Sequence, residues 1–175
     1  MRKLFFTLIF SSVLISCQKE KKEISYTIDT SSFVEVTDVS TFNYDGLKPM
    51  LHQKDDKIYV VNFWATWCLP CVKELPYFEK INQKYKDQNI EVILVSLDFP
   101  DQKEKRLIPY INKKKLQSKV VHFDDANEQF WIADISEKWT GAIPATLIYN
   151  KDKRQFYEQS FDYEGLEKEI KSFIK

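Results

Sequence analysis

The amino-acid sequence predicts one α/β domain built on a mixed β-sheet. Two apolar runs rich in β-branched residues, at 58–64 and 90–97, indicate strands that are buried on both faces. Segments with helical spacing alternate with these runs, and a hairpin pattern followed by a helix closes the chain. Such alternation is typical of α/β domains. The length of 175 residues suits one domain rather than two.

The segment ahead of the first buried run has weaker patterns. Residues 33–39 form a short β-like stretch, and residues 44–52 carry two leucines at helical spacing. Gly46 and Pro49 weaken the second pattern, because both residues disfavour a helix interior. We expect an N-terminal extension with one short strand and one short helix.

A longer helix is predicted directly after the first buried run. Its apolar stripe extends from Val72 to Tyr85, and the pattern ends near Asp87. Pro76 falls in the interior of this helix, where proline removes a backbone hydrogen bond. We therefore expect a kink at Pro76.

Beyond the second buried run the sequence predicts three further elements. Residues 103–116 indicate a polar, inserted helix with a kink at Pro109. Residues 120–123 indicate a short edge strand, and residues 129–139 another helix.

The end of the chain has the pattern of a hairpin and a helix. Residues 145–149 and 155–161 predict two strands around the polar turn 150–153. Residues 163–175 predict the last helix, since their apolar side chains recur at helical spacing.

Composition and charge exclude several classes of function. The chain has 26 Lys and Arg against 26 Asp and Glu, so it lacks the excess of positive charge that nucleic-acid binding requires. Its three glycines cannot form a GxGxxG or Walker phosphate loop. We expect no nucleic-acid partner and no bound cofactor.

The first residues have the pattern of a secretory signal. Arg2 and Lys3 precede an apolar run at 4–15 that is too short to span a bilayer. The run ends in Leu-Ile-Ser-Cys17, which resembles the lipobox of bacterial lipoproteins. That resemblance implies cleavage of residues 1–16, diacylation of Cys17 and stable membrane anchoring. The alternative is an ordinary secretory signal with an incidental cysteine.

A charged stretch follows the signal. Residues 18–23 contain no apolar side chain, so we interpret residues 17–30 as a solvated tether and residues 31–175 as the folded domain. The stretch also bears a weak resemblance to the charged sequence of surface-exported lipoproteins of Bacteroidota. We expect a lipid-anchored protein of the cell envelope that faces the periplasm, with exposure at the cell surface left open.

The chemistry concentrates where the first buried run meets the predicted helix. Cys68 and Cys71 form a CxxC pair at this junction, which is a redox signature rather than a metal signature. If Cys68 is the helix N-cap, its sulfur lies among unpaired backbone N–H groups that favour the thiolate. Cys71 lies one turn later on the same face, near enough to close a disulfide. Pro70 fits a first helical turn, where a missing N–H costs little.

Three motifs in this order resemble the thioredoxin superfamily and, within it, the TlpA/ResA-like disulfide reductases. Residues 62–71 are similar to their NFWATWCxPC motif, Glu74-Leu75-Pro76 to the E-x-P that follows, and residues 141–144 to the loop with a cis-proline. The resemblance covers residues 40–175. It implies a thioredoxin fold, with a central mixed sheet flanked by helices, and thiol–disulfide oxidoreductase activity.

The resemblance also implies roles for the catalytic residues. Cys68 is the exposed attacking thiolate, and Cys71 is the buried resolving thiol. Glu74 lies on the same helical face as Cys71, where a half-buried carboxylate can exchange a proton with that thiol. The alternative for Glu74 is an exposed acid in the first turn of the helix. Asn62 occupies the position of a buried aspartate in classical thioredoxin, so Glu74 has to carry the proton.

Substrate contacts are expected on both sides of the disulfide. The Ile143–Pro144 bond is expected to be cis, which leaves backbone groups of Ile143 free to pair with a substrate chain. Trp67 is expected to be partly exposed and to contact substrate, whereas Phe63 and Trp64 are expected in the core. We expect no metal ligand among these residues.

The implied partners are disulfide-bearing envelope proteins, among them apocytochromes c. A dithiol in an oxidising compartment also needs a membrane electron donor to act as a reductase. We expect a monomer that contacts the membrane through its lipid anchor.

Several alternatives stay open at this stage. A disulfide oxidase or isomerase of the same fold uses the same residues, and the Leu-Pro dipeptide between the cysteines does not set the redox potential. A peroxidase is disfavoured, because the P-x-x-x-T/S-x-x-C pattern fails at Val61 and Ala65. A copper-delivery module is disfavoured by the cysteine spacing, although His122 could supply a third ligand.

Overall fold

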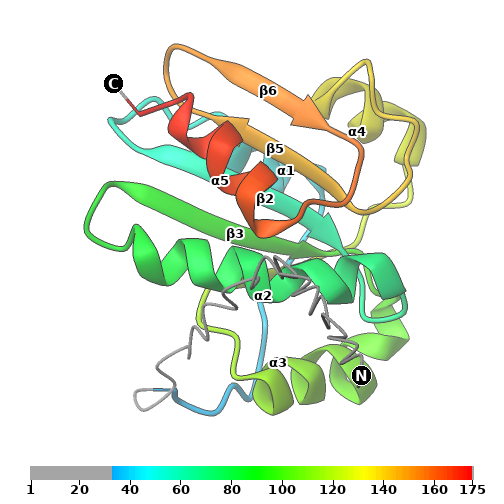
Figure 1. Cartoon of the computed structure of the whole chain (residues 1–175). Coiled ribbons are helices and arrows are strands. Elements are labelled where there is room, and N and C mark those ends of the chain that lie inside the picture. The colour runs from blue at the N-terminus through cyan, green and yellow to red at the C-terminus, as the bar shows by residue number, and fades with distance from the viewer. Residues whose placement is uncertain (1–32, 175) are drawn as a thin grey trace, which may run out of the picture.

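This computed structural model describes residues 33–174 of the chain. These residues form a six-stranded mixed sheet with helices around it. The strands lie in the spatial order β1-β4-β3-β2-β5-β6 (Figure 1). Their bounds are β1 Thr41–Phe42, β2 Ile58–Trp64, β3 Ile90–Ser96, β4 Lys119–Phe123, β5 Ala145–Tyr149 and β6 Arg154–Tyr157. The first four strands in this order are parallel to one another, and β5 and β6 continue the sheet in antiparallel fashion. The predicted α/β class with a mixed sheet is confirmed.

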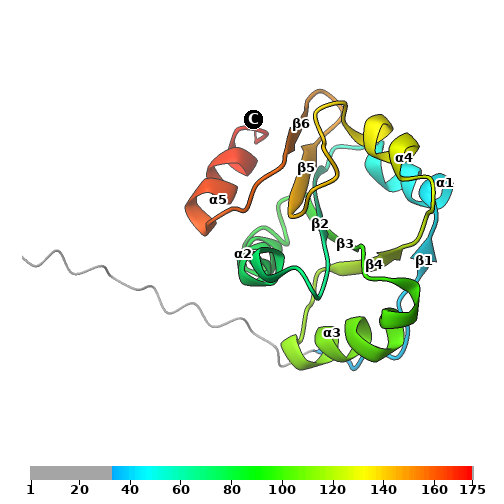
Figure 2. The same ribbon diagram turned by 90° about the vertical axis from the view of Figure 1, so that its right-hand side faces the viewer.

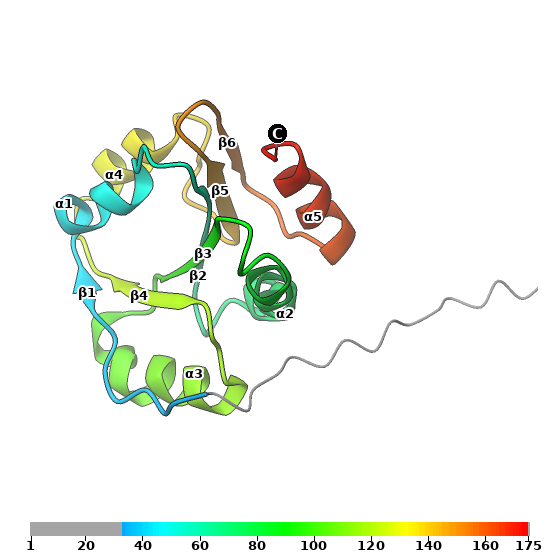
Figure 3. The same cartoon turned by 90° about the vertical axis from the view of Figure 1, so that its left-hand side faces the viewer.

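Helices cover both faces of the sheet (Figure 2 and Figure 3). One face carries α2 (Leu69–Lys84), α3 (Ile108–Lys114) and α5 (Tyr163–Lys171). The other face carries α1 (Tyr44–Leu47) and α4 (Glu128–Ile135). Each face has its own apolar core, and burial of that surface is the main force that holds the layers together.

Strand β2 is the centre of the molecule. All seven of its residues are buried, as the continuous apolar run predicts for a strand with a helical layer on each face. It pairs with β3 on one side and β5 on the other. The carboxyl end of β2 therefore lies inside the molecule, and α2 begins beside it.

The helix predicted after β2 is present as α2, although it ends at Lys84 rather than near Asp87. It remains one helix through Pro76. Phe78 and Ile81 are fully buried on its inner face, and Pro76 is exposed on its outer face. The burial of the inner face stabilises the helix at the position where the proline removes a backbone hydrogen bond.

The strand predicted at 33–39 is wrong. Instead, the Asn112 side chain on α3 pairs with both backbone groups of Val36, at 2.8 Å from its N–H and 2.9 Å from its carbonyl oxygen. This side chain satisfies the backbone in place of a neighbouring strand. The actual first strand is the two-residue β1, and the helix expected at 44–52 is α1 followed by a 3₁₀ helix, Lys48–Leu51.

The edge position expected for residues 120–123 is also wrong, because β4 lies between β1 and β3. The helix expected at 103–116 is a π-helix, Lys103–Leu107, followed by α3. Pro109 is the second residue of α3 and follows the π-helix without a break. The proline thus lies where the helical backbone changes from π to α geometry.

The C-terminal elements are shorter than expected. Helix α4 ends at Ile135 rather than at residue 139, β6 ends at Tyr157 rather than at 161, and α5 ends at Lys171. Trp139 and Phe161 contributed apolar character to those patterns, but each lies in a loop and points into a core. Within residues 33–174 no helix is long and apolar enough to cross a membrane.

We predict that Phe78→Ala lowers the free energy of unfolding by about 3–5 kcal/mol, because it leaves a cavity between α2 and the sheet. Phe78 is completely buried in that core. Denaturant unfolding followed by circular dichroism measures the change. The control is Lys73→Ala on the exposed face of the same helix, for which we expect a change within about 0.5 kcal/mol. An equal loss in both variants would contradict the prediction.

Candidate active site

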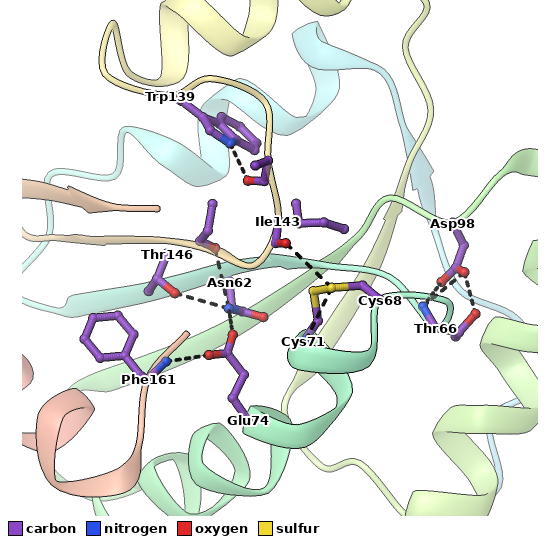
Figure 4. The surroundings of a disulfide bond; sticks show 12 residues. Asn62, Thr66, Cys68, Cys71, Glu74, Asp98, Trp139, Ile143, Thr146 and Phe161 are labelled. Atoms are coloured by element: carbon purple, nitrogen blue, oxygen red, sulfur yellow. Dashed lines mark hydrogen bonds between the residues drawn. A yellow bond between two sulfur atoms is a disulfide. The ribbon is translucent and has the colours of Figure 1, made fainter. Parts of the chain in front are cut away.

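The two cysteines lie at the N-terminus of α2, immediately beyond the end of β2 (Figure 4). Cys68 is the N-cap of the helix, in an extended conformation, as predicted. Its Sγ accepts a hydrogen bond from the Cys71 backbone N–H at 3.3 Å. The sulfur thus takes one of the backbone donors that a helix N-terminus leaves unpaired, and it lies at the positive end of the helix dipole.

Cys68 and Cys71 are joined by a disulfide, with an S–S distance of 1.98 Å and a Cα–Cα distance of 5.3 Å. Cys71 is completely buried. Cys68 is only 6% exposed, so the prediction of an exposed nucleophile is wrong for this disulfide form. The Ile143 carbonyl oxygen lies 3.7 Å from Cys68 Sγ.

Exposed apolar side chains surround the buried disulfide. Trp67 is 47% exposed and Leu69 64% exposed, on either side of Cys68. The Trp67 ring stacks on Phe99, which is itself largely exposed. Phe63 and Trp64 are fully buried in the two cores, as expected. Exposed apolar side chains thus frame the disulfide, while the strand that leads to it is anchored in both cores.

A loop ahead of β5 brings a second backbone segment to the disulfide. The Ile143–Pro144 bond is cis, as predicted. Upstream, the Trp139 Nε1–H donates to the Ala142 carbonyl oxygen at 2.8 Å. The Glu158 carboxylate accepts hydrogen bonds from the backbone N–H groups of Thr140 and Ala142. These contacts fix the loop and hold the Ile143 carbonyl against Cys68.

Glu74 is a buried carboxylate on the same face of α2 as Cys71 (Figure 4). Its Oε2 accepts the Phe161 backbone N–H at 2.7 Å, and its Oε1 accepts Asn62 Nδ2 at 2.9 Å. Desolvation raises the pKa of Glu74 to about 7, although the two hydrogen bonds lower it in part. The alternative of an exposed first-turn acid is wrong. A carboxyl group whose pKa lies near neutral pH, one helical turn from Cys71, is suited to exchange a proton with that thiol.

Asp98 also belongs to the site, and sequence reasoning missed it. It is buried at the carboxyl end of β3, and its carboxylate accepts hydrogen bonds from the Thr66 backbone N–H, the Thr66 hydroxyl and the Ser96 hydroxyl. These bonds fix the turn that leads into Cys68. Its position directly after the second buried run could have indicated this role. The carboxyl ends of adjacent parallel strands meet at one edge of the sheet, so residues that follow them lie close together.

His122 lies in this same edge region but serves another purpose. It is 1% exposed, its Nε2 lies 2.8 Å from the Asp98 carbonyl oxygen, and its Nδ1 lies 3.1 Å from the Thr41 hydroxyl. Both ring nitrogens thus have structural partners that join β1 to the loop after β3. The copper alternative needs His122 as a third ligand, and these contacts disfavour it.

An open groove of about 420 Å³ runs beside the disulfide. Its lining includes Trp67 and Phe99, and also Trp131 and Ile132 of α4. Ile143, whose carbonyl oxygen lies 3.7 Å from Cys68 Sγ, lines it as well. The structure thus brings together six of the residues that the sequence singled out, namely Trp67, Cys68, Cys71, Glu74, Ile143 and Pro144. Cys17, the signal at 1–16 and the whole tether at 17–30 lie outside the described residues, as do the first two residues of the domain expected at 31–175.

Comparison with known proteins identifies the family of the chain. The AhpC/TSA family matches residues 34–154. The chain is 31% identical over 134 residues to the thiol-disulfide oxidoreductase ResA of Bacillus thuringiensis strain Al Hakam, which is 77% of this chain and 68% of that protein. The failure of the peroxidase pattern in the sequence is consistent with this similarity to a thiol-disulfide oxidoreductase.

Solved structures show the same fold. A thioredoxin-related protein from Neisseria meningitidis serogroup B superposes with a TM-score of 0.58 at 21% identity, over 68% of this chain and 86% of that one. A secreted thiol-disulfide isomerase from Corynebacterium glutamicum superposes with a TM-score of 0.56 at 15% identity, over 68% and 71%. At these identities the structures establish the thioredoxin fold alone.

We predict that Glu74 makes the stability of the oxidised protein depend on pH. Because the pKa of Glu74 is about 7 in the folded state and ordinary in the unfolded state, its contribution is complete at low pH and is lost as pH rises through about 7. Between pH 4.5 and 7.5 the free energy of unfolding should fall by about 3 kcal/mol relative to Glu74→Gln. Urea unfolding of both proteins across this range measures it, and parallel pH profiles would refute the prediction.

Proposed function

We propose that the protein works as a disulfide reductase. The premise is that the chain belongs to the AhpC/TSA family and is a ResA-like thiol–disulfide oxidoreductase of the thioredoxin fold. Its substrates are protein disulfides. One observation carries the proposal, namely the Cys68–Cys71 disulfide at the N-terminus of α2, with the buried Glu74 one turn beyond it.

In the proposed cycle Cys68 is the attacking residue. After reduction, its sulfur retains the backbone N–H of Cys71 and the positive end of α2, which stabilise the thiolate. The thiolate attacks one sulfur of a substrate disulfide. A bond forms between that sulfur and Cys68, and the second substrate sulfur leaves as a thiolate.

Cys71 then releases the substrate. Glu74 takes the thiol proton of Cys71, and the Cys71 sulfur attacks Cys68 Sγ. The Cys68–Cys71 disulfide forms, and the first substrate sulfur leaves as a thiolate. Two electrons have passed from the dithiol to the substrate. The buried position of Cys71 supports this order, because the inner thiol reaches Cys68 but not an incoming protein.

Trp67, Ile143 and Pro144 form the proposed substrate-binding edge. Trp67 is largely exposed beside Cys68 and lines the groove. The Ile143 carbonyl oxygen lies 3.7 Å from Cys68 Sγ, so a peptide that paired with the backbone of Ile143 would pass next to this sulfur.

The reducing direction requires a supply of electrons. In an oxidising compartment the pair rests as the disulfide, so a membrane electron donor has to re-reduce it. Disulfide-bearing envelope proteins, among them apocytochromes c, are the proposed substrates. We propose that the protein works as a monomer.

The location follows from residues that the structure does not describe. We propose that residues 1–16 are removed, that Cys17 carries the lipid anchor and that residues 17–30 tether the domain of residues 31–175 to the membrane surface. In this proposal the domain lies outside the cytoplasm, facing the periplasm or the cell surface.

A trapping experiment tests the proposed cycle. We predict that Cys71→Ser accumulates mixed disulfides with envelope proteins, because the resolving thiol is missing. The control is Cys68→Ser, which should trap none. Non-reducing electrophoresis of cells that express each variant detects the adducts. Absence of adducts with Cys71→Ser would refute the proposed substrate class.

A redox titration against glutathione sets the direction. The potential expected for a reductase lies near that of thioredoxin, about −270 mV, and a value near about −120 mV would mark an oxidase instead.

The anchor has its own test. We predict that Cys17→Ser abolishes incorporation of radiolabelled palmitate and moves the protein from the membrane fraction to the soluble fraction. Cys68→Ser serves as the control and should retain label and membrane association. Label retained by Cys17→Ser would refute lipidation at this residue.

A further inference from the structure

Asn62 connects the buried carboxylate to the sheet. It is completely buried on β2, and its Nδ2 lies 2.9 Å from Glu74 Oε1, 3.1 Å from the Thr146 hydroxyl and 3.5 Å from the Ala145 carbonyl oxygen. An amide nitrogen has two hydrogens to donate. The Nδ2 group is thus fully used by acceptors on α2 and β5.

The other end of this amide has no partner. Among residues 33–174, Asn62 Oδ1 is one of three buried side-chain polar atoms without a hydrogen bond. A buried acceptor that lacks a donor is unfavourable, and such an atom in a native structure calls for an explanation. In Figure 4 this oxygen points away from Glu74, toward Cys71 and the disulfide.

Turning the amide over does not remove the problem. A flip would place Oδ1 against the Ala145 carbonyl oxygen and against Glu74, both of which are acceptors when Glu74 is ionised. It would also break two hydrogen bonds from Nδ2. While Glu74 is ionised, the arrangement with a free Oδ1 therefore keeps the hydrogen bond to Glu74 that the flipped amide would lose.

The disulfide explains the missing donor, because a sulfur in a disulfide carries no hydrogen. We propose that Asn62 is a positioning residue whose Oδ1 accepts a hydrogen bond from the Cys71 thiol once the disulfide is reduced. Reduction by a thiol reductant transfers two electrons and breaks the S–S bond, and the proton that Cys71 gains becomes the donor for Oδ1. This inference deepens the proposed function, since it assigns a role in the reduced dithiol.

Asn62 then holds both partners of the proton exchange. Its Oδ1 accepts from the Cys71 thiol while its Nδ2 donates to Glu74, so one side chain contacts both groups. The groups that face Glu74 from neighbouring elements are the Asn62 amide of β2 and the Phe161 N–H ahead of α5. Within the described residues no charged side chain contributes to its ionisation.

The redox equilibrium of the full chain with glutathione tests the inference. Asn62→Leu removes both the orphaned acceptor of the oxidised form and the thiol's acceptor in the reduced form, and both changes favour the oxidised form. We expect the equilibrium constant for reduction to fall about tenfold, which corresponds to about 30 mV. The matched control is Thr146→Val, which removes a partner of Nδ2 but leaves Oδ1 intact. It should shift the constant by less than about twofold. Equal shifts in the two variants would show a merely structural role and overturn the proposal.

A spectroscopic measurement reads the hydrogen bond directly. In a Cys17→Ser, Cys68→Ser chain the single thiol is Cys71, and its S–H stretching band in the infrared should lie at the lower frequency of a hydrogen-bonded thiol. Adding Asn62→Leu should move the band to the free-thiol frequency, and adding Thr146→Val should not. If the chain that retains Asn62 already shows the free-thiol band, the proposal is overturned. This result does not depend on any substitution of Asn62. Neither measurement uses a protein substrate, so a failed trapping experiment would count against the proposed function alone.

Discussion

A buried carboxylate needs hydrogen-bond donors, and the donors to Glu74 come from two other parts of the fold. One donor comes from Asn62 on the central strand, and the other is the Phe161 backbone ahead of α5. The carboxylate therefore ties α2 to the sheet and to the last helix. The same burial raises the pKa of Glu74 to about 7, so the group that fixes the helix can gain or lose a proton near neutral pH.

The remaining site residues depend on this anchored helix. Cys68 caps α2, and two loops press against the cap from opposite sides: the Asp98 loop through Thr66, and the Ile143 loop through its carbonyl oxygen. Each loop has its own hydrogen bonds to the body of the protein, through His122 in the first case and Glu158 in the second. The disulfide is thus framed by fixed backbone, while the exposed surface around it comes from apolar side chains on these loops.

The sequence predicts the chemistry of the site better than its packing. Local patterns suffice for the CxxC pair on a strand–helix junction and, through the family resemblance, for the cis bond at Pro144. Residues whose role depends on distant partners were missed: Asp98 meets Thr66 only when two parallel strands align, and Phe161 meets Glu74 only when the chain after β6 folds back. The same limit explains the errors at the ends of elements. Asn112 replaces a strand beside Val36, and Trp139 belongs to a core rather than to a helix.

The two outermost strands of the sheet are among its shortest, with two residues in β1 and four in β6. A protein that handles disulfides of other proteins meets partly unfolded chains, and such chains add readily to an open sheet edge. Upstream of β1, the Asn112 side chain takes both backbone groups of Val36, so this extended segment is held against α3. The short outer strands leave only a short row of backbone groups at each edge of the sheet with which an unfolded chain could pair.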